Sequence, residues 1–99
     1  MTKCVTIRAV IESFKDKETR KIWYREFSSR LPTEIQRVAY RKLVIIHRSQ
    51  SLNDLRVPPG NRLEALSGKR AGQHSIRINQ QWRVCFRWEN GRAVDVEIT

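Results

Sequence analysis

Apolar residues recur at helical spacing in the first half of the chain. The clearest pattern lies between Pro32 and Ser49 and predicts one long amphipathic helix that begins at Thr33. Thr33 and Gln36 have the spacing of a capping box, in which the threonine side chain caps the first turn. One side of this helix would carry the apolar residues Ile35, Val38, Ala39, Leu43 and Ile46.

A second, shorter helix is predicted over Lys15–Phe27. Asp16 can cap this helix, and Ile22, Trp23 and Phe27 would cluster on one of its sides. The residues before it alternate weakly between apolar and polar and predict an edge strand, whose apolar positions are Val5, Ile7, Ala9 and Ile11.

The second half of the chain alternates apolar and polar residues, which is the pattern of strands with one buried face. Four strands are predicted, over Arg62–Leu66, His74–Asn79, Trp82–Trp88 and Ala93–Thr99. Asn90-Gly91 is typical of a two-residue hairpin turn between the last two strands. The residues predicted to face the helices are Leu63, Ala65, Ile76, Ile78, Trp82, Val84, Phe86, Trp88, Val94, Val96 and Ile98. Those predicted to face outward are Arg62, Glu64, Ser75, Arg77, Arg83, Cys85, Arg87, Asp95 and Glu97.

These elements together predict an α+β fold. An N-terminal strand and two helices would pack on one face of a mostly antiparallel sheet of four to five strands. The 99 residues suffice for a single domain over residues 1–99. The stretch from Val57 to Asn61 is interpreted as a rigid connector, because Pro58 and Pro59 lack backbone donors and Gly60 permits a tight turn.

The charge of the chain indicates an anionic partner. The formal net charge is +10, and from Arg56 to Arg92 only Glu64 and Glu89 oppose the basic residues. No apolar run approaches the roughly 20 residues needed to span a membrane, and no signal peptide is visible. Two cysteines without a secretory signal favour a reduced, cytoplasmic protein. The cysteines and histidines match no metal-ligand spacing, so neither a metal nor another cofactor is expected.

The candidate chemistry lies on the polar face of the predicted sheet. Glu64 would sit among Arg62, Arg77 and Arg83, which could clamp a phosphodiester and stabilise charge that develops on it. Glu64 is either a general base or a structural partner of these arginines. His74, whose side chain would point toward the core, is either a structural residue or an acid–base group.

Two other basic segments remain open to two interpretations. Lys69 and Arg70 lie in a glycine-flanked loop that either joins two strands or also grips backbone phosphate. The arginines of the long helix, which are Arg37, Arg41 and Arg48, form a solvated face or a phosphate-binding surface.

The segment Leu55–Arg77, LRVPPGNRLEALSGKRAGQHSIR, closely resembles the HigB/GraT-type killer toxins of the RelE superfamily. The match continues in Ile78–Trp88, Ser13–Asp16 and Ile35–Ala39. The resemblance extends from about Val10 to Thr99, and residues 1–9 before it are either an N-terminal extension or the result of a misassigned start codon.

This resemblance implies a bacterial type II toxin that docks in the ribosomal A site and cuts mRNA during translation. The RNA would be cut by attack of its own 2′-hydroxyl, without a metal. A helix-turn-helix, HigA-like antitoxin encoded in the same operon would neutralise the toxin. The implied catalytic residues are Glu64, Arg77 and Arg83, with His74 as a further candidate. The implied RNA-binding residues are Arg62, Lys69, Arg70 and Arg87.

The end of the chain departs from the pattern of this family. Its members usually end in an Asp-Tyr-His tail that carries part of the chemistry, whereas this sequence ends at Thr99. The alternative interpretation is therefore a catalytically weak or inactive module that binds the ribosome or the antitoxin. On this basis the 99-residue chain is expected to bind ribosomes and to cleave mRNA poorly.

Overall fold

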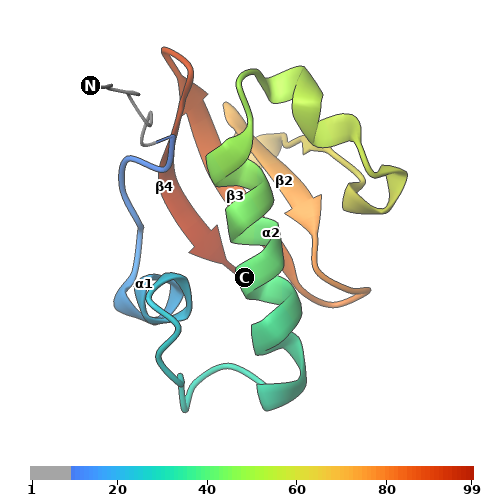
Figure 1. Ribbon diagram of the computed structural model, residues 1–99. Coiled ribbons are helices and arrows are strands. Elements are labelled where there is room, and N and C mark those ends of the chain that lie inside the picture. Colours follow the sequence, from blue (N-terminus) through green and yellow to red (C-terminus); the bar gives the residue numbers. More distant parts are fainter. Residues whose placement is uncertain (1–9) are drawn as a thin grey trace, which may run out of the picture.

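The computed structural model describes residues 10–99, which form two helices on one face of an antiparallel sheet (Figure 1). The helices are α1 (Lys17–Trp23) and α2 (Thr33–Arg48). The sheet has the order β1-β2-β3-β4 and consists of β1 (Glu64–Ala65), β2 (Gln73–Arg77), β3 (Arg83–Glu89) and β4 (Arg92–Ile98). The predicted α+β fold is therefore confirmed. Residues 1–9, which include the predicted strand positions Val5, Ile7 and Ala9, lie outside the described residues.

Helix α1 has the predicted cap at Asp16, but it is shorter than the predicted Lys15–Phe27 at both ends. Asp16 caps it, because its Oδ1 accepts a hydrogen bond of 3.1 Å from the backbone N–H of Thr19. The helix ends at Trp23, and Arg25 adopts a positive φ of 61° that a helix cannot continue through. The predicted extension to Phe27 is wrong: the side chain of Phe27 is 66% exposed instead of clustering with Ile22.

Helix α2 begins at the predicted residue without the predicted capping box. Its N-cap is Pro32, and no side chain caps it. Gln36 instead binds the loop that precedes the helix: its Nε2 donates to the carbonyls of Ser28 and Leu31, at 2.7 and 2.9 Å. Its Oε1 accepts from the N–H of Ser28 at 3.2 Å. The chain folds back over the first turn, so the glutamine satisfies the loop instead of the helix start.

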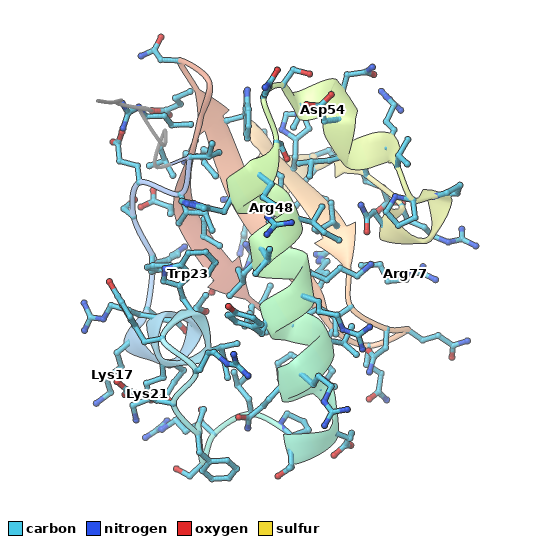
Figure 2. The ribbon with its side chains drawn as sticks, viewed as in Figure 1. Lys17, Lys21, Trp23, Arg48, Asp54 and Arg77 are labelled. Atoms are coloured by element: carbon cyan, nitrogen blue, oxygen red, sulfur yellow. The ribbon has the colours of Figure 1, made fainter. Side chains whose placement is uncertain are left out.

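The apolar side of α2 forms the centre of the core against β3 and β4. Ile35, Ala39, Leu43 and Ile46 are buried as predicted, and Val38 is partly buried. From the sheet, Val84 and Phe86 are fully buried beneath them. Trp23 lies between α1 and α2 (Figure 2), with its ring centroid 6.1 Å from that of Tyr40. The opposite side of α2 is exposed at Arg37, Arg41 and Arg48.

A bulge in β4 corrects one predicted side-chain direction. The turn at Asn90-Gly91 has positive φ at both residues, 53° and 76°, which confirms the predicted hairpin. The register then shifts between Cys85 and Arg87 on β3, and Asp95 on β4 takes a φ of 54°. The extra residue reverses the alternation, so Ala93 is fully buried and Val94 pairs with Arg87 on the outer face. The prediction that Val94 faces the helices is wrong.

The segment before α1 runs along β4 without forming a continuous strand. Ile11 and Phe14 make isolated parallel bridges with Ala93 and Val96. Between these bridges, the N–H of Asp95 donates to Oγ of Ser13 at 2.9 Å. The bulge therefore breaks the ladder that the predicted edge strand requires.

Phe86→Ala is expected to lower the free energy of unfolding by about 3–5 kcal/mol, because it removes a fully buried aromatic ring between α2 and the sheet. Chemical denaturation measures this loss. Phe27→Ala is the matched control, since Phe27 is 66% exposed and its removal leaves no cavity in the core. Equal stability of the Phe86 variant and the wild-type chain would contradict the assigned core face.

Acid is expected to weaken the anchoring of the α1–α2 loop. A hydrogen bond from the Ser28 hydroxyl, together with Lys21 and Lys17, lowers the pKa of Glu18 from its ordinary value of 4.5. A lowered pKa in the folded state contributes stability above that value, and this stability is lost as the pH falls through the folded pKa. The free energy of unfolding should therefore decline less steeply below pH 4.5 in Glu18→Gln than in the wild-type chain. Glu34→Gln, at an exposed position, serves as the control; identical acid profiles for all three proteins would refute this role of Glu18.

Candidate functional site

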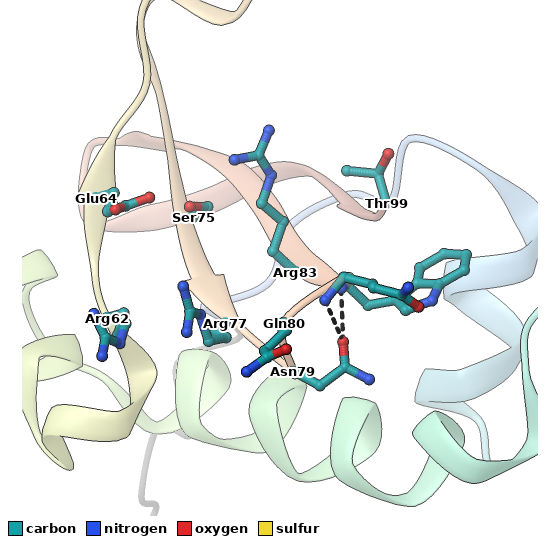
Figure 3. Close-up of a pocket in the computed structure, with 10 residues that line it drawn as sticks. Arg62, Glu64, Ser75, Arg77, Asn79, Gln80, Arg83 and Thr99 are labelled. Atoms are coloured by element: carbon teal, nitrogen blue, oxygen red, sulfur yellow. Dashed lines mark hydrogen bonds between the residues drawn. The ribbon is translucent and has the colours of Figure 1, made fainter.

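A cleft of about 270 Å³ opens where the ends of β2, β3 and β4 meet the segment that enters β1 (Figure 3). Four charged side chains line it, and they come from three separate strands or their flanks. The remaining lining residues are polar or aromatic. The full lining consists of Arg62, Glu64, Ser75, Arg77, Asn79, Gln80, Gln81, Trp82, Arg83 and Thr99.

Arg62 is held in place by a buried asparagine next to it. The side chain of Asn61 is fully buried, and its Nδ2 donates to the carbonyls of Leu55 and Val57, at 3.1 and 3.3 Å. From α2, Lys42 Nζ donates to Asn61 Oδ1 at 2.7 Å, and burial is the main cause that lowers the pKa of this lysine. Arg62 follows with a φ of 46°, which turns the chain into β1. These contacts confirm an ordered connector between α2 and the sheet.

Arg77 and Arg83 lie directly opposite each other in the β2–β3 ladder. Like charges at such a position repel, and a bound anion relieves this repulsion. The backbone of Arg83 is fixed from its other side, because it exchanges two hydrogen bonds of 2.9 Å with Thr99. Glu64 pairs with Ser75 in the β1–β2 ladder, which brings its carboxylate to the same cleft.

The charges of the cleft are unpaired within the part of the chain that the structure describes. Across residues 10–99, no ion pair within 4.0 Å involves Arg62, Arg77, Arg83 or Glu64. The predicted juxtaposition of these four residues is present, but direct ion pairing of Glu64 with the arginines is not. Three arginines against one carboxylate leave an excess of positive charge, and such a cleft suits a phosphate group.

The structure places the other predicted RNA-binding residues outside this cleft. Arg70 Nη1 is 3.1 Å from Glu97 Oε1, and Arg87 Nε is 3.8 Å from Asp95 Oδ2. Lys69 is exposed in the 3₁₀ turn Gly68–Arg70. These three cations therefore do not converge on the cleft in this structure, and two of them have carboxylate partners.

His74 lies on the helix-facing side of the sheet. Its ring stacks on Phe86, with 6.3 Å between the ring centroids, and it lines a different cavity together with Leu52 and Leu63. Its Nδ1 is buried and has no hydrogen-bond partner among the described residues. The predicted inward direction is confirmed, and this direction separates His74 from the cleft residues.

No role in the site was predicted for Asn79 of the cleft, or for Lys42 and Asn61, which order the segment that carries Arg62. Asn79 Oδ1 accepts hydrogen bonds of 2.8 Å from the backbone N–H groups of both Gln81 and Trp82, as the dashed lines in Figure 3 show. An asparagine that closes its own turn in this way is common between strands, so Asn79 itself is a detectable turn signal. The roles of Lys42 and Asn61 had no comparable signal, because they depend on a contact between distant parts of the chain.

Other kinds of site find little support in the described part of the chain. Cys85 is fully buried on the outer face, and burial raises the pKa of its thiol, which opposes formation of a reactive thiolate. Within residues 10–99, no three His, Cys, Asp or Glu residues are grouped as a metal site would require. In the same range, no helix is both long and apolar enough to cross a membrane.

Two helices packed on a four-stranded antiparallel sheet are consistent with a RelE-like domain. The chain belongs to the HigB-like family of type II toxins: the family model described as "RelE-like toxin of type II toxin-antitoxin system HigB" matches residues 12–98. Toxin HigB-1 of Vibrio cholerae serotype O1 is 42% identical over 83 residues, which cover 83% of this chain and 87% of that protein. An uncharacterized protein of Haemophilus influenzae is 39% identical over 83 residues, which cover 83% of this chain and 82% of that protein.

Asn61→Ala is expected to destabilise the domain by about 1–3 kcal/mol, the usual cost of leaving buried polar groups without partners. The variant deprives Lys42 and two backbone carbonyls of their hydrogen bonds. Asn53→Ala is the control, because Asn53 is exposed and its side chain accepts a hydrogen bond from Arg56 at the surface. Urea denaturation of both variants measures the difference, and equal unfolding midpoints would show that the Asn61 contacts do not hold the connector.

Proposed function

We propose that this type II toxin is a ribosome-dependent mRNA endoribonuclease that inhibits translation in the cytoplasm. The observation that carries the proposal is the set of unpaired arginines around Glu64, with Arg77 directly opposite Arg83. Arginine side chains are bidentate donors that match the oxygens of a phosphodiester. The family relationship supports RNA as the source of this phosphodiester.

In the proposed reaction the mRNA supplies its own nucleophile. A ribose 2′-oxygen attacks the adjacent phosphorus, the bond from phosphorus to the 5′-oxygen breaks, and a 2′,3′-cyclic phosphate forms. Glu64 accepts the proton of the 2′-hydroxyl, and the leaving 5′-oxygen takes a proton from solvent. Arg77 and Arg83 stabilise the charge that develops on the phosphoryl oxygens, and Arg62 holds the neighbouring backbone. This route assigns no step to a metal or another cofactor.

The proposed partners are the ribosome with its mRNA and a HigA-like helix-turn-helix antitoxin from the same operon. Lys69, which is exposed in the turn Gly68–Arg70, would contact RNA backbone, and Arg87 would exchange its contact with Asp95 for a phosphate. Arg70 would exchange its contact with Glu97 for a phosphate. His74 has no role in this proposal, because its ring is packed on Phe86 away from the cleft.

A second candidate is a module that binds the ribosome or the antitoxin with little or no cleavage. One observation favours it: Glu64 is the single side chain with a carboxylate among the residues that line the cleft. The arginines alone can bind and polarise a phosphate, but a general acid or base typically contributes about 10²–10⁴-fold to the rate. Binding and cleavage must therefore be measured separately.

Arg77→Ala combined with Arg83→Ala is expected to weaken ribosome co-sedimentation and to abolish mRNA cleavage in primer extension on translating ribosomes. Loss of two phosphate contacts should also reduce the slope of log affinity against log salt by roughly one to two. Arg41→Ala combined with Arg48→Ala removes the same charge from the exposed side of α2 and is the matched control. If the cleft variant binds ribosomes and cleaves mRNA like the wild-type chain, the cleft is not the RNA site; a loss in the α2 variant would assign phosphate binding to α2 as well.

Glu64→Gln in the same assays separates the two candidates. The enzyme proposal requires that cleavage falls by about 10²–10⁴-fold while ribosome binding is kept. If the wild-type chain co-sediments with ribosomes but leaves the mRNA intact, the binding module is the correct assignment. Unchanged cleavage in Glu64→Gln would remove this residue from the chemistry.

A further inference from the structure

A second hollow lies in the helical layer, outside the arginine cleft. It has a volume of about 290 Å³ and shares no residue with the cleft. We call it the aromatic groove; it is lined by Ile22, Arg25, Glu26, Phe27, Gln36, Arg37 and Tyr40. Phe27 is 66% exposed, and the neighbouring Tyr24 is 63% exposed. Aromatic side chains contribute strongly to the energetics of interfaces, so two exposed aromatic residues beside a groove suit a binding surface.

The loop that presents these aromatic residues is tied down on both sides. Before Phe27, the N–H groups of Arg25 and Glu26 donate to carbonyls of α1, at 3.0 and 2.8 Å. After Phe27, Ser28 is fully buried, and the Gln36 amide holds both its N–H and its carbonyl. The Ser28 hydroxyl also donates to Glu18. Phe27 is thus held in solvent by an ordered backbone, and this preorganisation lowers the entropic cost of binding.

The charges around the groove select the chemistry of the partner. Arg37 is exposed at one wall and available to a carboxylate. The guanidinium of Arg25 lies 5.1 Å from the centroid of the Tyr40 ring, so it covers a face on which a nucleobase would otherwise stack. Glu26 in the same lining opposes a continuous polyanion such as an RNA backbone more than it opposes a single carboxylate placed at Arg37. These features favour a protein segment with an apolar anchor and one carboxylate over RNA.

We propose that the aromatic groove is the docking site of the antitoxin. An apolar side chain of the antitoxin enters the groove between Ile22 and Phe27, and a neighbouring carboxylate pairs with Arg37. This inference rests on the antitoxin partner named in the proposed function, and it is independent of RNA cleavage. It assigns RNA and antitoxin to two different surfaces of the domain.

The test measures affinity of the full chain for the purified helix-turn-helix antitoxin encoded beside its gene. Phe27→Ser and Arg37→Glu are each expected to weaken binding by about tenfold or more, as loss of an interface anchor does. Val57→Ser is the matched control for the first variant, since Val57 is 71% exposed and lies outside the groove. Arg41→Glu is the control for the second, on the same helix and outside the groove. Both controls, and Arg83→Ala in the cleft, should bind within about threefold of wild type.

Ribosome co-sedimentation and mRNA cleavage of Phe27→Ser are measured in parallel and should equal those of wild type. If wild type does not cleave mRNA but the groove variants still lose antitoxin binding, the docking proposal stands and the enzyme proposal fails. Antitoxin binding that is unchanged in both groove variants overturns the docking proposal, even where cleavage is observed. A wild-type chain that does not bind the antitoxin overturns it as well, and so does selective loss of ribosome binding in the groove variants.

Discussion

The pairing of β3 with strands on both of its sides is the constraint on which the rest of the structure depends. Because successive side chains of a strand point to opposite faces, β3 presents Phe86 to the core and Arg83 to the cleft. Its pairing with β2 sets Arg77 opposite Arg83, and its pairing with the end of β4 fixes the backbone of Arg83 through Thr99. The core under α2 and the charge of the cleft are therefore set by one register.

Local alternation explains why so much of the cleft was predictable. The outward positions Glu64, Arg77 and Arg83 follow from period-two patterns that need no knowledge of distant contacts, and the structure brings these residues together. The start of α2 and the Asn90-Gly91 turn were also predictable, because each follows from residues that are neighbours in the sequence. The incorrect predictions concern contacts between residues that are distant in the sequence. The bulge at Asp95 reverses Val94 and brings the Asp95 N–H to the Ser13 hydroxyl, a contact between distant segments that no local pattern indicates.

The same distinction applies to polar residues whose partners are remote in sequence. Gln36 has the spacing of a capping box, but its amide serves Ser28 and Leu31 because the loop folds back over the helix. Asn61 was placed in a rigid connector, but its contact with Lys42 of α2 could not be foreseen. Both residues satisfy buried backbone groups, which are costly to leave without partners. Gln36 and Asn61 therefore order the two loops that carry Phe27 and Arg62, and these loops belong to the two proposed binding surfaces.

Helix α1 has residues beside both proposed binding surfaces, the cleft and the aromatic groove. The contacts of these residues decide whether a substitution in the groove also disturbs the cleft. Near the start of the helix, the fully buried Thr19 accepts a hydrogen bond of 2.9 Å from the N–H of Ile98, which anchors the end of β4 beside the cleft. Beyond the end of the helix, Arg25 and Phe27 line the aromatic groove. The anchor is a buried hydroxyl, whereas Phe27 is an exposed side chain on a loop that other residues hold. A substitution at Phe27 therefore alters the groove without loosening Thr19, and so the two surfaces can be tested separately in one folded domain.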